Sequence, residues 1–287
     1  MKKKNRLKKT YKEKLKILGR YKKVFWVFIS VTFFVLFVFY LSQGPSNNKN
    51  WETGFDVSPN IQIKGDSFTI KNLRNWKYTK TDVIGFDYIN QTYNFSQVEK
   101  AWFLVEPFSN NWEAVAHTYF VFDFKDGRTL ALSIEARREK GENYNIFLGL
   151  FKKYELFYVW GTEEDLTGTR AVQRDHNIYM YPINISVYYT QELLKSLVFE
   201  SSSLDSTPKF YNSITSNCTN NLAKAANRVN PKAIPNIYYY TLPGNSINKL
   251  VKLGYLPADS LENKSDYNIK ERVKKHYGNE NFSSLIR

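Results

Sequence analysis

The sequence predicts an α+β domain, with an antiparallel sheet and a cysteine-bearing helix, that follows one transmembrane helix. Three observations support this class. An uncharged apolar stretch lies near the N-terminus, two strands with alternating apolar and polar residues flank a glycine turn at residues 114–137, and helical spacing appears at Thr190–Phe199 and Thr219–Val229. A hairpin combined with separate later helices is typical of α+β domains.

The transmembrane helix is predicted at Val24–Ser42, where no residue is charged. At 1.5 Å per residue, this length is enough to cross a hydrocarbon core of about 30 Å, and only a helix satisfies its backbone groups there. A cleaved signal peptide is the alternative. Such a peptide has a shorter apolar core followed by small residues, and Gln43–Asn48 does not show that pattern. An anchor is therefore favoured.

Most of the net positive charge belongs to the segment before this helix. Met1–Lys23 contains twelve Lys or Arg residues and one acid, which leaves residues 24–287 with +3 of the net +14. The high pI therefore gives no support for nucleic-acid binding, which we exclude. By the positive-inside rule, residues 1–23 are predicted to be cytoplasmic and the domain to lie outside, on the periplasmic or outer side; the basic residues can also contact anionic lipid.

The rest of the chain divides into a linker, a domain and a tail. Residues 43–50 are a polar Ser/Asn/Pro/Gly linker, residues 51–256 are predicted to be the extracytoplasmic domain, and the charged, weakly patterned residues 257–287 are expected to form a surface tail. Further short strands are predicted at Asp82–Tyr88, Ala101–Val105, Leu156–Trp160 and Ile178–Pro182, and Thr190 is a candidate N-cap.

The hairpin pattern also predicts its own register. A loop of three residues with Gly127 in the left-handed conformation pairs Phe124 with Arg128, which sets Phe120 against Leu132 and Phe122 against Leu130. A two-residue turn would slip this pairing by one and set apolar faces against polar ones. The favoured register places His117 directly opposite Glu135, within hydrogen-bonding reach.

Cys218 is the one cysteine and precedes the helix predicted from Thr219. A thiol at a helix N-terminus is near unpaired N–H groups that favour the thiolate and could hold an oxyanion. The alternative interpretation is a small apolar residue that packs the helix on the sheet. The polar neighbours Asn217, Thr219, Asn220 and Asn221 make a functional role as plausible as this structural one.

His117 is the preferred partner for this thiol. A strand histidine next to a carboxylate is what a Cys–His nucleophile needs, because Glu135 would fix the tautomer and stabilise the imidazolium. His176, among turn residues, and His276, in the tail, are weaker candidates for the base. Three scattered histidines and one cysteine have no metal-ligand spacing, so no metal or other cofactor is expected.

Four more residues are candidate substrate-binding positions. Arg137 and Arg138 could bind a phosphate or carboxylate, although a solvated strand end is the simpler interpretation. Tyr119 shares the strand face of His117, and Asn217 precedes the thiol. Glycine-rich phosphate loops and serine nucleophile elbows are absent from the sequence.

Several of these segments, in this order, resemble one family, the extracytoplasmic domain of the Bacteroides-type lipoprotein N-acyltransferase, Lnb. The resemblance extends from about Asn72 to Leu256, and its motifs are Ala116–His117–Thr118, the run from Ser133 to Gly141, Tyr154–Glu155, Tyr211–Asn212, Asn217–Cys218–Thr219 and Leu242–Pro243–Gly244. It implies a circularly permuted NlpC/papain-like fold in which Cys218 is the nucleophile and His117 its base. The family carries several membrane helices after this domain, whereas this sequence shows only the N-terminal one.

The resemblance implies acyl transfer through a Cys218 thioester. A membrane phospholipid would supply the acyl chain, and the N-terminal amine of a lipoprotein would receive it. Two alternatives remain. The first is a Cys–His hydrolase acting on an amide or ester, for example in a peptidoglycan peptide, and the second is a binding module that keeps the fold without activity.

Overall fold

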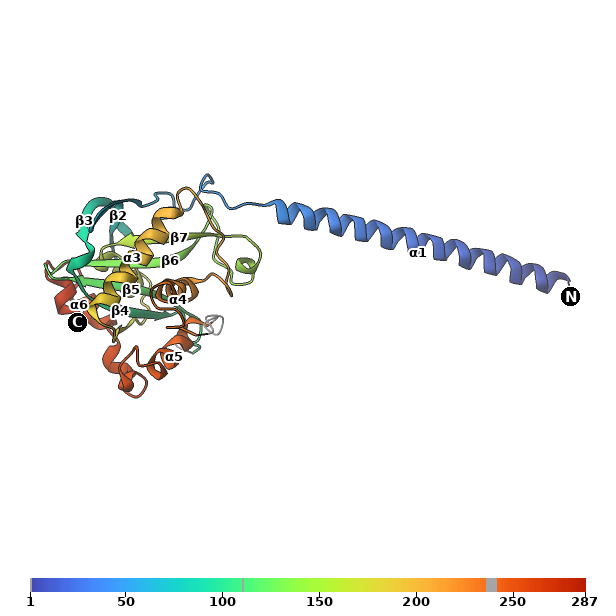
Figure 1. The fold of residues 1–287 in the computed structure, drawn as a ribbon. Helices are drawn as coiled ribbons and strands as arrows, with labels where there is room; N and C mark the ends of the chain where they lie inside the picture. Colours follow the sequence, from blue (N-terminus) through green and yellow to red (C-terminus); the bar gives the residue numbers. More distant parts are fainter. Residues whose placement is uncertain (1, 110, 236–241) are drawn as a thin grey trace. The chain divides into compact units, whose positions relative to one another are not determined.

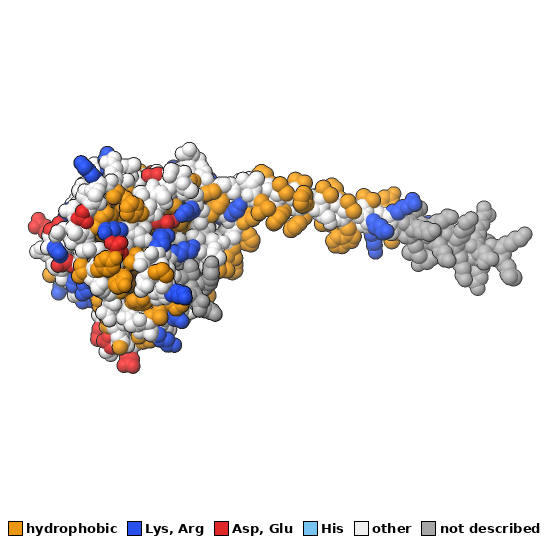
Figure 2. Space-filling view, viewed as in Figure 1, with side chains coloured by type: hydrophobic (Ala, Val, Ile, Leu, Met, Phe, Trp, Pro, Cys, Tyr) orange, Lys and Arg blue, Asp and Glu red, His pale blue; other side chains and the backbone are white. Residues whose placement is uncertain are grey.

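The structure is a computed structural model that describes residues 2–109, 111–235 and 242–287. It separates into two compact units, residues 1–44 and residues 45–287. The first unit is the helix α1 (Lys2–Ser42), and within the described residues its Leu18–Ser42 portion is the one helix long and apolar enough to cross a membrane. Its apolar side chains are exposed along this portion (Figure 2). Helix α1 therefore includes the basic segment as well as the predicted helix Val24–Ser42.

The second unit is built on an eight-stranded sheet with the order β1-β2-β7-β6-β5-β4-β8, with β3 paired to β2 (Figure 1). All pairings are antiparallel except the short parallel contact between β2 and β7. The strands are β1 (Asn60–Lys64), β2 (Ser67–Tyr78), β3 (Val83–Asn94), β4 (Val98–Pro107), β5 (Ala116–Phe124), β6 (Thr129–Arg137), β7 (Glu155–Gly161) and β8 (Tyr179–Pro182). The predicted mixed α+β class with an antiparallel sheet is therefore confirmed, and β3 extends beyond the run predicted at Asp82–Tyr88.

The central hairpin β5–β6 has the predicted register. Phe120 pairs with Leu132 and Phe122 with Leu130, and the Phe124 N–H donates to the Arg128 carbonyl at 3.0 Å. Gly127 has φ +81°, a conformation that favours glycine because it has no Cβ. The alternating apolar pattern and this one glycine were therefore enough to fix the pairing.

Both faces of the sheet are covered. On one face, α3 (Val187–Ser203) and α4 (Cys218–Val229) pack against a cluster that includes Phe120 and Phe122 (Figure 1). The opposite face includes Tyr119 and Val121 and is covered by α2 (Glu163–Gly168), α6 (Lys270–His276) and α7 (Phe282–Leu285). The short helix α5 (Ser246–Lys252) extends the first layer. Alternate residues of β5 therefore belong to different cores.

Two sequence expectations need correction. Helix α3 is capped by Ser186, whose hydroxyl accepts from the Tyr189 N–H, so the proposed cap Thr190 lies buried inside the helix. Residues 257–287 are not a loose surface tail. Their apolar side chains are sparse but converge on the second core, and the buried ones are Ile269, Val273, Phe282 and Ile286. Arg287 adds ion pairs with Asp123 and Glu163.

Candidate active site

The site is built around Cys218, the first residue of α4. Asn217 caps this helix, because its side-chain oxygen accepts from the Asn220 N–H at 2.8 Å and the Asn220 side chain accepts in return from the Asn217 N–H. The thiol is 3 % exposed, and its Sγ lies 3.8 Å from Thr219 Oγ1. The thiol therefore lies at the positive end of a well-capped helix and is screened from bulk water.

His117 lies close to Cys218, although its strand belongs to the sheet and Cys218 to the helical layer. His117 lies on the sheet face opposite α4, but it is the second residue of β5, and Cys218 is the first residue of its helix. Burial alone would raise the pKa of Cys218. The charge and hydrogen bond of His117, with hydrogen bonds from Thr118, outweigh burial and lower the pKa to about 7.

Glu135 and Ser133 of β6 hold the other side of the imidazole. His117 Nε2 lies 2.6 Å from Ser133 Oγ and 3.3 Å from Glu135 Oε1, and the Ser133 hydroxyl donates to the same Glu135 oxygen at 2.6 Å. Since the single hydroxyl proton goes to Glu135, Ser133 accepts from Nε2–H, which leaves Nδ1 for the thiol. Burial would lower the pKa of His117, but the negative charges of Glu135 and Cys218 raise it above its usual value.

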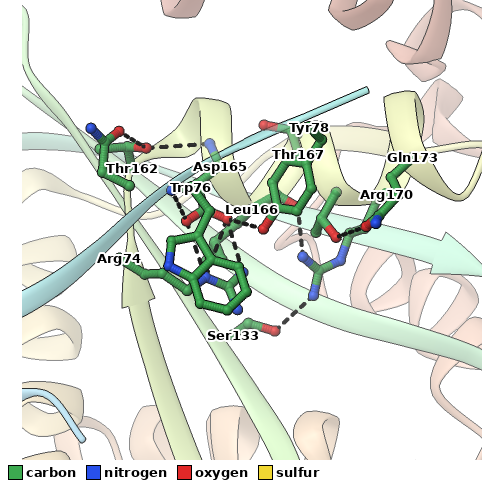
Figure 3. Close-up of polar contacts among 12 residues, drawn as sticks. Arg74, Trp76, Tyr78, Ser133, Thr162, Asp165, Leu166, Thr167, Arg170 and Gln173 are labelled. Carbon is green, nitrogen blue, oxygen red and sulfur yellow. Dashed lines mark hydrogen bonds and ion pairs between the residues drawn. The ribbon is translucent and has the colours of Figure 1, made fainter. Parts of the chain in front are cut away.

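Arg170 fixes this carboxylate from behind. It lies in a π-helical turn after α2, and its Nη2 donates to Ser133 Oγ at 2.9 Å and to Glu135 Oε1 at 3.1 Å. Its Nη1 donates to the Leu166 carbonyl, so the guanidinium is held between α2 and β6 (Figure 3). Its Nε contacts the buried Glu106 Oε2 at 2.8 Å. One buried cation thus orients two carboxylates.

Both carboxylates are held in the ionised form. Burial alone would raise the pKa of Glu106, but Arg170 and a hydrogen bond from His176 bring it down to about 2. Burial acts in the same direction on Glu135, whose pKa is nevertheless held well below its ordinary range by His117 and Arg170. A permanent negative charge therefore lies beside the imidazole.

Tyr119 and Asn217 support this cluster and are buried. The Tyr119 ring stacks near His117, with centroids 6.2 Å apart and planes at 18°, and it faces the Arg170 guanidinium at 4.4 Å. Asn217 uses its side-chain amide to cap α4 and to donate to the Ser213 carbonyl. That both bind substrate stays a prediction, and the contacts described here hold their side chains within the site.

The side chains of the two other predicted substrate-binding residues contact the N-terminal part of the domain. Arg137 is buried, and its donors reach the Phe55 carbonyl, Asn47 Oδ1 and Ser58 Oγ. Arg138 lies over the Phe55 ring at 5.0 Å. The guanidinium of Arg137 is therefore occupied by contacts with the N-terminal part of the domain.

The alternative bases do not reach the thiol. His176 Nδ1 contacts Glu106 Oε1 at 2.8 Å, and His276 ends α6 in the second layer. Among the described residues, no group of three or more His, Cys, Asp or Glu side chains could hold a metal ion.

Three members of the cluster were missed by the sequence reasoning: Ser133, Arg170 and Glu106. Ser133 had a usable signal, because it shares the strand face of Glu135 two residues away. Glu106 of β4 pairs with His117 of β5, but the strand predicted there ended at Val105, one residue earlier. Arg170 lies 35 residues from Glu135 and had no local pattern that distinguished it from a surface arginine.

An apolar cavity of about 150 Å³ adjoins the site. It lies between the sheet, α3, α4 and the segment around α5, and its walls include Phe120, Leu193, Leu222, Ala226 and Leu250. Thr219 also lines it, and this residue contacts Cys218 Sγ and donates to or accepts from Thr118 Oγ1 at 2.8 Å. One residue thus separates the thiol from a cavity suited to an apolar ligand.

The fold and the site together define an α+β domain with a Cys–His–carboxylate cluster, preceded by an N-terminal helix long and apolar enough to cross a membrane. The chain belongs to the family of the Lnb N-terminal periplasmic domain, whose family model matches residues 86–246, a range that includes His117, Glu135 and Cys218. This family and the N-terminal apolar helix fit a single-pass membrane protein with a periplasmic domain. No curated protein and no solved structure matches the chain.

Proposed function

We propose that this protein is a lipoprotein-processing acyltransferase that works through a thioester on Cys218. The observation that supports the proposal is that Cys218, at the N-terminus of α4, lies beside His117, whose Nε2 contacts Ser133 and Glu135. The order of the chain, with a histidine strand before a cysteine helix, supports a circularly permuted NlpC/papain-like arrangement. Membership of the Lnb family is compatible with an enzyme.

The first step is attack of the Cys218 thiolate on the ester carbonyl of a phospholipid. The S–C bond forms as the carbonyl electrons move to oxygen, and amide groups at the start of α4 are placed to stabilise this oxyanion. Collapse of the intermediate breaks the ester C–O bond. His117 gives its Nδ1 proton to the departing lysophospholipid oxygen, and the acyl chain remains on sulfur.

In the second step, the amine of a lipoprotein's N-terminal cysteine attacks the thioester. His117 accepts the amine proton as the N–C bond forms, and the thiolate leaves as the S–C bond breaks. Glu135 stabilises the imidazolium in both steps, and it stays ionised throughout because His117 and Arg170 lower its pKa.

The cavity beside Thr219 favours transfer over hydrolysis. Its lining is almost entirely apolar, and an apolar cavity of this volume stays dry and accepts small apolar groups. An acyl chain whose end lies there would displace no polar contact and would help to keep water from the thioester.

Intact-mass analysis tests this proposal. The full chain is exposed to phospholipid vesicles, and an added acyl mass on wild-type protein but not on Cys218→Ala is the expected result. Adding a diacylglyceryl peptide with a free N-terminal amine should remove the adduct and acylate the peptide. Release of fatty acid without peptide acylation would identify a hydrolase, and no adduct and no turnover with either acceptor would identify a silent binding module.

A further inference from the structure

A cluster of exposed apolar side chains lies next to the N-cap of α4. We call it the apolar patch, and its members are Ile146, Phe147, Leu148, Phe151 and Ile214. Phe147 and Phe151 are the most exposed, at 72 % and 63 %. Isolated apolar residues on a surface need no explanation, but a contiguous group of large ones marks a contact surface.

The fold holds the patch in this exposed position. Asn145 Oδ1 accepts from the Phe147 and Leu148 N–H groups, and the Asn145 N–H donates to the buried Tyr154 hydroxyl. The loop is joined to Ile214 because Ser213 donates through its N–H to the Gly149 carbonyl at 3.1 Å and through its hydroxyl to the Ile146 carbonyl at 2.7 Å. These contacts prevent the loop from folding its aromatic side chains inward.

The same contacts connect the patch to the candidate active site. The Ser213 carbonyl accepts from Asn217 Nδ2 at 3.1 Å, and Asn217 is the residue before Cys218. The patch is therefore joined through Ser213 and Asn217 to the residue that carries the thiol.

The chain segments that carry the patch have a small excess of positive charge. These two segments, residues 143–154 and 206–224, contain four lysines and no acidic residue. Residues 24–287 have a net charge of only +3, so the rest of the domain is slightly acidic. Lys153 and Lys209 pair with Glu142 and Glu200 outside these segments, and Lys224 donates to the Thr215 carbonyl.

The length of the linker gives an independent reason for a lipid surface. Ser46 donates to Glu155, the first residue of β7, and Lys49 pairs with the same carboxylate at 2.8 Å. Asn47 donates to the carbonyls of Leu204 and Asp205. Only Gln43–Pro45 separate Ser46 from the end of α1. Fully extended, the chain from Ser42 to Ser46 spans at most about 14 Å. Glu155 directly follows the segment with the patch and bridges to Phe210, so the linker joins the domain at this edge.

From these observations we infer that the apolar patch inserts into the surface of the membrane that holds α1. Its aromatic and aliphatic tips would enter the boundary between headgroups and acyl chains, about 5–10 Å deep, with the flanking lysines at anionic headgroups. The patch would thereby place the start of α4 at the bilayer surface. This inference does not depend on which reaction Cys218 performs.

Site-directed fluorescence on the full chain tests the inference. In a Cys218→Ser background, which removes the one native thiol, Phe147→Cys and Phe151→Cys are each labelled with an environment-sensitive nitrobenzoxadiazole dye. Phe86→Cys is the matched control, since Phe86 is an aromatic residue with 54 % exposure on β3, across the domain from the β6–β7 connection (Figure 1). The proteins are reconstituted into vesicles of phosphatidylcholine and phosphatidylglycerol that carry a doxyl quencher near the headgroup.

The expected result is blue-shifted emission at positions 147 and 151, with quenching several-fold stronger than at position 86, and weaker quenching without phosphatidylglycerol. Quenching at positions 147 and 151 no stronger than at position 86 would overturn the inference. Blue-shifted emission without doxyl quenching would also overturn it, because the patch would then be covered by protein. Unchanged melting temperatures, relative to unlabelled Cys218→Ser protein, verify the fold of each variant. None of these readouts requires catalysis. A negative result would therefore reject membrane insertion of the patch without bearing on the proposed reaction.

Discussion

The variant Glu135→Gln separates a catalytic role of Glu135 from a structural one. Gln keeps the size and one acceptor oxygen for Ser133 and Arg170, but it removes the negative charge 3.3 Å from His117 Nε2. With an effective dielectric constant of about 20, a pair at this distance interacts by about 5 kcal/mol. The Glu135 side chain is 27 % exposed and shares its charge with Arg170, so the interaction with His117 is weaker than this figure, and its loss should lower the pKa of His117.

This change should appear first at the thiol. Loss of Glu135 lowers the pKa of His117, and a less protonated imidazole stabilises the Cys218 thiolate less, so the pKa of Cys218 should rise from about 7. Iodoacetamide alkylation followed by intact mass measures this pKa directly, because Cys218 is the one cysteine in the chain. Acylation from phospholipid should slow by about 10²-fold at neutral pH.

A matched control shows whether the effect is specific. Glu142→Gln removes a carboxylate that pairs with Lys153 at the surface, and it should change neither the alkylation profile nor the rate. If Glu135→Gln lowered the melting temperature but left both the alkylation profile and the acylation rate unchanged, Glu135 would act only as a structural partner of Arg170. That result would remove it from the mechanism while leaving Cys218 and His117 in place.

Four further outcomes are expected. Arg170→Met should destabilise the domain by about 3–5 kcal/mol, because it leaves the buried Glu106 carboxylate without its main counter-ion; a melting temperature near wild type would contradict this. The low pKa of Glu106 predicts stability that is present above pH 4.5 and lost as the pH falls toward about 2, and acid melting curves of Glu106→Gln should lack this component. Ala226→Phe should partly fill the cavity and slow acylation by long-chain donors more than by short-chain ones, with equal slowing as the contrary result. A reporter fused after Arg287 should be active only outside the cytoplasm, and cytoplasmic activity would reverse the proposed topology.

Local patterns in the sequence determined several features of this protein. The uncharged run after a basic segment predicted a helix able to span a membrane, and the Leu18–Ser42 part of α1 is long and apolar enough to do so. Alternating residues and Gly127 predicted the register of β5 and β6, and with it the approach of Glu135 to His117. These predictions succeed because period and turn geometry are properties of a few consecutive residues.

Tertiary structure alone decided which distant groups meet. Cys218 and His117 are about 100 residues apart and belong to different layers, and only the packing of α4 over the end of β5 brings them together. Arg170 is a second example. An arginine in a sequence is usually a surface residue, but here its ion pairs with Glu106 and Glu135 hold it in a buried position. Residues 257–287 are packed for a similar reason, since four widely spaced apolar side chains find a partner only on the completed sheet. A local pattern records whether a residue tends to be buried, whereas the identity of its partners depends on the closure of the whole sheet.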